Sequence, residues 1–398
     1  MIYTIFYFIL LFFITIFSFS KKCNNLGKML LVLYTSVAAI ATYAISANII
    51  QLKSINFFPY IYLVLCYLIF FSPFLTKYNK LSVSKLKYRI DNKIMIFAII
   101  YLVCTIITIY VYFPYVLENI SSNNWAANRL ALYSNGLKQV FSNKVEYYSI
   151  LFVDYFQILA LIVGFLFIKE NKILGYTLII GEALTVICSS IYTSSRGTLV
   201  DLFVLLIAFY FFFYEGLEKK SRKFIYVISS LGLGAIFPYV VAVTVSRFSS
   251  SNAGNAIILY LGQAPIVFNA GVFNIFKYSW GSFGFGNLFG LTSFTEANVG
   301  GTWNSGFFTF VGWFYIDWGI IGVLILGIIL SIIFKYIINK RNYKLSDIFL
   351  IFSYYQFFLK GVFVIGRSYC FTILATLLIY VFLKIVVDNK KYIIREGK

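Results

Sequence analysis

Eleven long apolar segments run through this chain, and they constrain its fold more than any other feature of the sequence. A helix that crosses a bilayer needs about 20 mostly apolar residues, because its backbone must satisfy its own hydrogen bonds there. Such helices are predicted at about 2–20, 29–50, 57–76, 94–117, 147–168, 173–193, 198–214, 224–245, 306–334, 347–366 and 368–387. We therefore expect an all-α fold, a polytopic membrane helix bundle with about eleven transmembrane helices in a single integral membrane domain over residues 1–398.

The composition agrees with this class of protein. Apolar residues make up 61% of the 398 residues and charged residues only 12%, which is more apolar surface than one soluble core can bury. The net charge of +19 is a feature of some nucleic-acid-binding proteins, but here it is better explained by the loops of a membrane protein. No nucleic-acid partner is expected.

The distribution of basic residues predicts the orientation of the helices. With eleven helices, most of the 33 lysines and arginines fall on one side, which the positive-inside rule assigns to the cytoplasm. The first helix lacks a basic segment before it and is followed by Lys21 and Lys22, so we expect it to be uncleaved, with its N-terminus outside. The basic clusters on the predicted inner side are 21–28, 77–93, 169–172, 219–223, 335–344 and 384–398.

Two longer connections fall on the predicted outer side, at about 118–146 and 246–305. The stretch 256–276 in the second loop is apolar enough to lie in the membrane interface or to re-enter the membrane.

Arginine is unusually frequent on this outer side. Arg196 and Arg367 lie in short turns between helices, Arg247 follows a predicted helix, and Arg129 lies in the first outer loop. A guanidinium group binds phosphate through two parallel hydrogen bonds, so Arg196, Arg247 and Arg367 are predicted to bind a phosphate-bearing, membrane-borne ligand, with Arg129 as a further candidate. The alternative is that they reach toward lipid headgroups or cap helix ends.

Ionisable residues inside the predicted helices are the next candidates, because a charge in hydrocarbon is costly and usually faces a cavity or a partner. Asp154 and Asp317, together with Glu296 in the large outer loop, are the candidate catalytic carboxylates. Asp201 lies close enough in sequence to orient Arg196. Glu182 and Lys360 both lie at mid-membrane depth, where a purely structural ion pair between them is an alternative.

Trp303 and Asn304 lie side by side in the outer loop, and Trp125 lies in the first one. An indole ring stacks on a sugar face while an amide bonds its hydroxyls, so the three are candidate sugar-binding residues. A flexible Gly/Asn/Ser loop is the alternative for 300–306. The chain has no histidine, and its five cysteines form no close pair in sequence, so neither a disulfide framework nor a metal site is predicted.

The Ser-Arg-Gly turn at 195–197, the loop at Arg247 and the segment TWNSGFFTFVGWFYIDWGIIG at 302–322 resemble the oligosaccharide repeat-unit polymerases, or O-antigen polymerases of the Wzy type. The size, the helix number and the two outer loops are similar too. In some members an arginine in each outer loop is followed eleven residues later by a glycine. Here those positions after Arg196, Arg247 and Arg129 hold Ile207, Ile258 and Val140.

The resemblance implies a membrane glycosyltransferase that needs no metal or other cofactor. Such an enzyme joins undecaprenyl-pyrophosphate-linked repeat units into O-antigen, capsule or exopolysaccharide at the outer face of the bacterial cytoplasmic membrane. Implied partners are donor and acceptor lipids, the bilayer, a flippase and a chain-length regulator. It also implies that Arg196, Arg247 and Arg367 bind the pyrophosphate.

Two other functions remain open at this point. A flippase or transporter of lipid-linked oligosaccharide would also use a basic cavity, although such proteins often have two related halves, and no internal repeat is seen here. An O-antigen ligase is a related transferase, but ligases rely on a histidine in an outer loop, which this chain lacks.

Overall fold

Helices are the only regular secondary structure in the residues that the computed structural model describes. These residues are 1–21, 23–50, 55–75, 91–122, 125–135, 142–248, 253–274, 278–285, 308–363, 365 and 369–388. The α-helices are α1 (Ile2–Ser20), α2 (Asn25–Ser46), α3 (Phe57–Phe71), α4 (Asn92–Ser122), α5 (Trp125–Asn135), α6 (Lys144–Glu170), α7 (Lys172–Tyr192), α8 (Gly197–Phe213), α9 (Lys219–Phe248), α10 (Ala253–Ala270), α11 (Ser282–Phe285), α12 (Thr309–Ile338), α13 (Leu345–Lys360) and α14 (Tyr369–Val386).

The predicted all-α membrane bundle is confirmed. Each of the eleven predicted segments forms a helix, and nine helices in the described part of the chain are long and apolar enough to cross a membrane. The two numbers differ because α3 and α13 have only 15 and 16 residues, and the apolar stretch identified within α9 is short. Helix α10 is the additional one.

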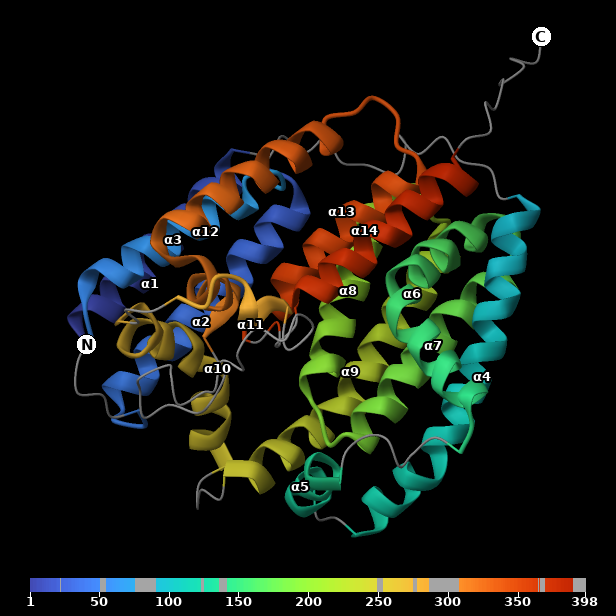
Figure 1. Ribbon diagram of the computed structural model, residues 1–398, viewed down its shortest axis with the longest axis horizontal. Helices are drawn as coiled ribbons and strands as arrows, with labels where there is room; N and C mark the ends of the chain where they lie inside the picture. The colour runs from blue at the N-terminus through green and yellow to red at the C-terminus, as the bar shows by residue number, and fades with distance from the viewer. Residues whose placement is uncertain are drawn as a thin grey trace.

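The helices form two groups (Figure 1). Helices α1, α2, α3, α10 and α12 pack together on one side, and α4, α6, α7, α8 and α9 pack on the other. Helix α13 contacts α12 in the first group and α6 and α8 in the second, and α14 lies against it. The groups therefore meet around α13, and residues carried by both reach the centre of the molecule.

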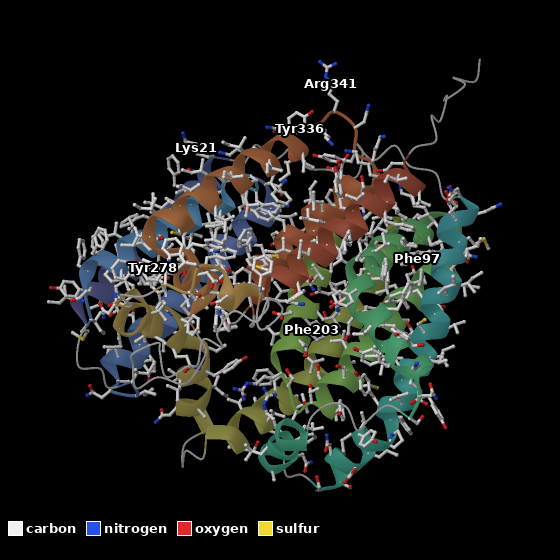
Figure 2. The ribbon with its side chains drawn as sticks, viewed as in Figure 1. Lys21, Phe97, Phe203, Tyr278, Tyr336 and Arg341 are labelled. Carbon is white, nitrogen blue, oxygen red and sulfur yellow. The ribbon has the colours of Figure 1, made fainter. Side chains whose placement is uncertain are left out.

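Basic residues far apart in the sequence gather at one end of the bundle, which we call the lysine-rich end. Figure 2 shows Lys21 and Arg341 along the same edge of the molecule. Lys93 at the start of α4 donates to the carbonyl of Val386 at the end of α14, and Lys172 at the start of α7 pairs with Glu218. This pairing lowers the pKa of the Glu218 carboxyl. The side that faces the cytoplasm stays a prediction.

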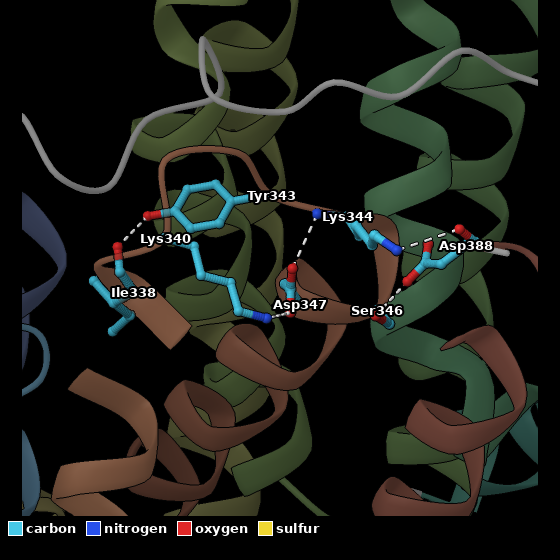
Figure 3. A network of polar contacts seen from close by, with 7 residues as sticks. All are labelled: Ile338, Lys340, Tyr343, Lys344, Ser346, Asp347 and Asp388. Carbon is cyan, nitrogen blue, oxygen red and sulfur yellow. Dashed lines mark hydrogen bonds and ion pairs between the residues drawn. The ribbon is translucent and has the colours of Figure 1, made fainter. Parts of the chain in front are cut away.

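A polar network fixes the α12–α13 connection at this end (Figure 3). The Lys340 ammonium pairs with Asp347 at 2.6 Å, and the Asp347 carboxylate also accepts a hydrogen bond from the backbone N–H of Lys344, the N-cap residue of α13. Ser346 and Lys344 both donate to Asp388, just after α14. Acidic side chains in a first helical turn are stabilised by the helix dipole, so Asp347 favours a helix start here.

Helix α10 belongs to the second predicted outer loop, and both of its ends lie away from the lysine-rich end. Its start follows the far end of α9, and Asn269 near its end exchanges hydrogen bonds of 2.9 and 2.7 Å with the backbone of Asn56 before α3. At Gly262 an added Cβ would lie 3.0 Å from the backbone of Ala41, so α10 packs closely on α2. The interfacial or re-entrant placement of this segment stays a prediction, because α10 is also long and apolar enough to cross a membrane.

Candidate functional site

The turn between α7 and α8 is the structural centre of the site. Helix α7 ends at Tyr192, and Ser194 then adopts a left-handed backbone conformation with φ of 47°, which reverses the chain within a few residues. The N–H of Ser195 donates to the carbonyl of Ser190 at 2.8 Å and holds the turn closed. Arg196 occupies the N-cap position of α8, and its own side chain does not cap the helix. A guanidinium group therefore lies at the positive end of the α8 dipole.

Arg196 is almost completely buried, with 1% of its surface exposed. Its guanidinium carbon lies 3.8 Å from the ring centroid of Tyr260 on α10, in a cation–π arrangement. The Tyr260 ring stacks in turn on Phe363, beyond the end of α13, with 5.4 Å between centroids. Burial lowers the pKa of Arg196 below its ordinary value, Tyr260 opposes this shift, and the positive charge of Arg129 adds to it.

Arg129 of α5 lies at the same turn. Its Nη1 donates to the carbonyl oxygens of Thr193 at 3.1 Å and Ser194 at 3.3 Å. Two predicted pyrophosphate-binding residues, 67 positions apart, are therefore brought close enough for their charges to interact. Close like charges are unfavourable, so an anion between them would relieve a repulsion present in the free protein.

Two hydroxyl groups add to the polar character of this turn. The side chains of Tyr192 and Ser194 are buried, and neither hydroxyl has a hydrogen-bond partner among the described residues. Unpaired buried polar groups are costly, so native structures usually satisfy them through a protein group, water or a ligand. Guanidinium groups, hydroxyl donors and a helix N-terminus together form an environment that suits a phosphate oxygen.

The structure bears differently on the other residues that were predicted to form the site. Trp125 is 6% exposed and packs edge-on against Tyr239 of α9, with centroids 5.2 Å apart, so no open ring face is left for a sugar. We therefore correct its predicted role to packing α5 onto α9. The backbone of Arg247 lies in the last turn of α9, and nothing is described of its side chain. Arg367, Glu296, Trp303 and Asn304 lie outside the described residues.

A cluster of ionisable residues lies deeper in the bundle. The charge of Lys360 on α13 acts on three carboxyl groups from three different helices, Asp154, Glu182 and Asp201. Glu182 accepts hydrogen bonds from Tyr101 and Gln157, and the amide of Gln356 donates to Gln157 at 3.1 Å. Asp154 remains exposed within this cluster.

The cluster revises the expected pair of Glu182 with Lys360. Asp201 lies within electrostatic range of Lys360, and its orienting of Arg196 stays a prediction. Glu182 does not form a simple pair with Lys360, because its direct hydrogen bonds come from Tyr101 and Gln157. Lys360 instead lies within electrostatic range of all three acids, and charged groups inside membrane proteins usually face such a partner.

Asp317 has a role different from the predicted one. Its carboxylate is fully buried and accepts four hydrogen bonds, from the hydroxyls of Ser279 and Tyr369 and the backbone N–H groups of Phe283 and Gly284. Two residues later, Gly319 has a φ of 64° and kinks α12. Because every acceptor position of Asp317 is occupied, we correct its predicted catalytic role to a structural one, joining α11 and α14 to α12.

Sequence reasoning missed Tyr260 and the position of Lys360 near three acids. Tyr260 lies in a stretch recognised only as apolar, and it is 64 positions from Arg196. An aromatic residue at a helix position carries no signal of a cation above its ring. Comparisons with protein-family models, with curated protein sequences and with solved structures find no match for this chain.

Proposed function

We propose that this protein joins lipid-linked oligosaccharide repeat units at the membrane surface opposite its lysine-rich end. The observation that carries the proposal is the buried Arg196, held on the ring of Tyr260 with Arg129 beside it. Two arginines at a helix N-terminus are suited to a pyrophosphate leaving group. The proposal also draws on the resemblance to O-antigen polymerases, and it places the protein in a bacterial cytoplasmic membrane.

In the proposed reaction, a hydroxyl oxygen of the acceptor repeat unit attacks the anomeric carbon of the donor's reducing-end sugar. The bond from that carbon to the pyrophosphate oxygen breaks, and the lipid pyrophosphate leaves with the electron pair. Arg196 and Arg129 stabilise the negative charge that develops on the leaving group, which requires no metal. The hydroxyl proton passes to a carboxylate or to water, and Asp154 is the exposed acid of the interior cluster.

The proposal is tested by replacing Arg196 with alanine in a cell that makes the glycan. Loss of long chains is expected while single repeat units are still displayed, because transfer between carriers fails after delivery. Removing one preorganised group that stabilises charge typically lowers a rate by about 10²–10³-fold. Chain length is measured by gel electrophoresis of the extracted glycan.

The matched control is Arg222→Ala. Arg222 also lies over a tyrosine ring, at 4.0 Å from the centroid of Tyr214, but belongs to the lysine-rich end. This variant should leave the chain-length distribution unchanged. A normal distribution in Arg196→Ala and Arg129→Ala, with both proteins present in the membrane, contradicts the proposal.

One observation favours a second candidate, a flippase or transporter of lipid-linked oligosaccharide. Ionisable residues within membrane-spanning helices, here Asp154, Glu182, Asp201 and Lys360, are common in transport pathways. In proteoliposomes, movement of labelled lipid without new glycosidic bonds would favour this candidate. New glycosidic bonds between repeat units supplied on one face would favour the polymerase.

A further inference from the structure

An apolar pocket lies between α12, α13 and α14, apart from the arginine site. Its volume is about 350 Å³, and its walls are mostly aromatic and aliphatic, including Phe314, Phe334, Tyr354 and Phe357. Along α13 it extends from Leu350 to Lys360, ten residues of helix or about 15 Å. The pocket therefore extends along about 15 Å of α13.

The pocket opens toward the lipid-facing surface. Ile333 of α12 and Leu377 of α14 line it, yet they are 46% and 45% exposed. Both helices are apolar enough to cross a membrane, so the mouth of the pocket faces the hydrocarbon region. A ligand can enter from the bilayer without crossing water.

The polar end of the pocket lies near the arginine site. Gln356 and Lys360 line that end, and Lys360 lies within electrostatic range of the three acids of the interior cluster. Ile365 also lines the pocket, and Phe363, two residues earlier, stacks on the Tyr260 ring that carries Arg196. The loop after α13 thus connects the phosphate-binding turn to the apolar pocket.

We infer that this pocket binds one isoprenoid chain of the lipid carrier whose pyrophosphate binds at Arg196. The inference rests on the proposed function, since that function supplies the carrier. A volume of 350 Å³ is at the small end of ligand pockets, so it suits part of one chain and not the paired acyl chains of a phospholipid. The chain runs from the arginine site toward the lysine-rich end, as for a lipid with its headgroup at the opposite surface.

The test uses a polyprenyl phosphate with a diazirine on its chain, added to the full-length protein in nanodiscs of phosphatidylethanolamine and phosphatidylglycerol. Photolysis should label peptides of α12, α13 and α14, and unlabelled undecaprenyl phosphate should compete. Thr376→Trp fills the pocket wall on α14 and should lower labelling about tenfold. Leu378→Trp is the control, because Leu378 lies on the same helix but is 71% exposed and does not line the pocket.

If Thr376→Trp fails to fold, the test still stands on the unmodified protein, where unlabelled undecaprenyl phosphate should reduce labelling by the diazirine probe. Labelling without competition, or equal labelling by a diazirine phosphatidylglycerol, overturns the inference. Labelling requires no turnover, so the two proposals fail separately. Pocket labelling in a protein whose Arg196→Ala and Arg129→Ala variants both still make long chains would remove the polymerase proposal alone. Normal dependence on Arg196 without pocket labelling would remove only this inference.

Discussion

The carboxylate of Asp317, a residue predicted from the sequence to be catalytic, holds α11 and the start of α14 against α12. Four donors surround it, two from the backbone of α11, one from Ser279 and one from Tyr369 at the start of α14. An added Cβ at Gly284 would lie 2.8 Å from its Oδ2 atom, so the backbone of α11 approaches the carboxylate closely. A buried charge is stable only when it is so well solvated by protein donors.

Asp317→Asn should therefore lower stability more than it changes chemistry. The amide places an NH₂ group where two donors now point, and each unsatisfied donor costs about 1–3 kcal/mol. Thermal unfolding in detergent, followed by tryptophan fluorescence, measures the loss. Glu118→Gln, at an exposed position of α4, is the control and should be neutral. Unchanged stability together with lost activity would return Asp317 to the candidate catalytic residues.

At the scale of elements, glycine sets how closely α6 and α7 approach. An added Cβ at Gly175 would lie 2.6 Å from the backbone nitrogen of Ile168 and 2.7 Å from the carbonyl oxygen of Gly164. Small residues allow such close packing in membranes, where the hydrophobic effect does not hold helices together. The α6–α7 pair also carries Asp154 and Glu182, so its spacing affects the interior cluster.

Gly175→Ala should accordingly destabilise the protein, because the backbones must separate to admit a methyl group. The expected cost is about 1–3 kcal/mol, as for overpacking of a core. Gly234→Ala in α9 is the matched control. A Cβ there meets nothing within 4 Å, so the helix preference of alanine should leave stability unchanged or raise it by about 0.5–1 kcal/mol. Equal unfolding temperatures for the two variants would show that the close packing of α6 and α7 at Gly175 does not contribute to stability.

At the scale of the whole molecule, charge separates the two ends of the bundle. Described basic residues of five connections and of the end of α14 lie at one end, while Arg129 and Arg196 lie at the other. The proposed polymerase reaction, with repeat units delivered by a flippase, requires the arginine end to face outward. The positive-inside rule predicts that orientation from the lysines alone.

Single cysteines introduced into a cysteine-free variant test this orientation. Ser121→Cys, exposed near the end of α4, should react with a membrane-impermeant maleimide in intact cells. Arg341→Cys, exposed between α12 and α13 at the lysine-rich end, should react only after the cells are opened. The reverse pattern would place the arginines in the cytoplasm and contradict an outer-face polymerase.

Much of the fold was predictable because hydrophobicity acts locally. A run of apolar residues such as 2–20 or 368–387 must form a helix in lipid whatever it packs against, and lysine clusters predict the side of each connection. Helix length was less predictable at α3 and α13, which are shorter than the predicted segments. Those helices end where turns and packing contacts stop them, and a hydropathy pattern contains no signal of either.

The sequence by itself determined the apolar helices and picked out Arg196 and Arg129 as candidate residues. Only the tertiary structure decided that these two arginines lie at one turn, that Arg196 lies over the ring of Tyr260, and that Lys360 lies within electrostatic range of three acids. The tertiary structure also showed that Asp317, a predicted catalytic residue, and Trp125, a predicted sugar-binding residue, hold helices together. The physical reason is range: the apolar patterns that form helices act between neighbouring residues, whereas burial, stacking and charge pairing depend on residues that only the packed bundle brings together.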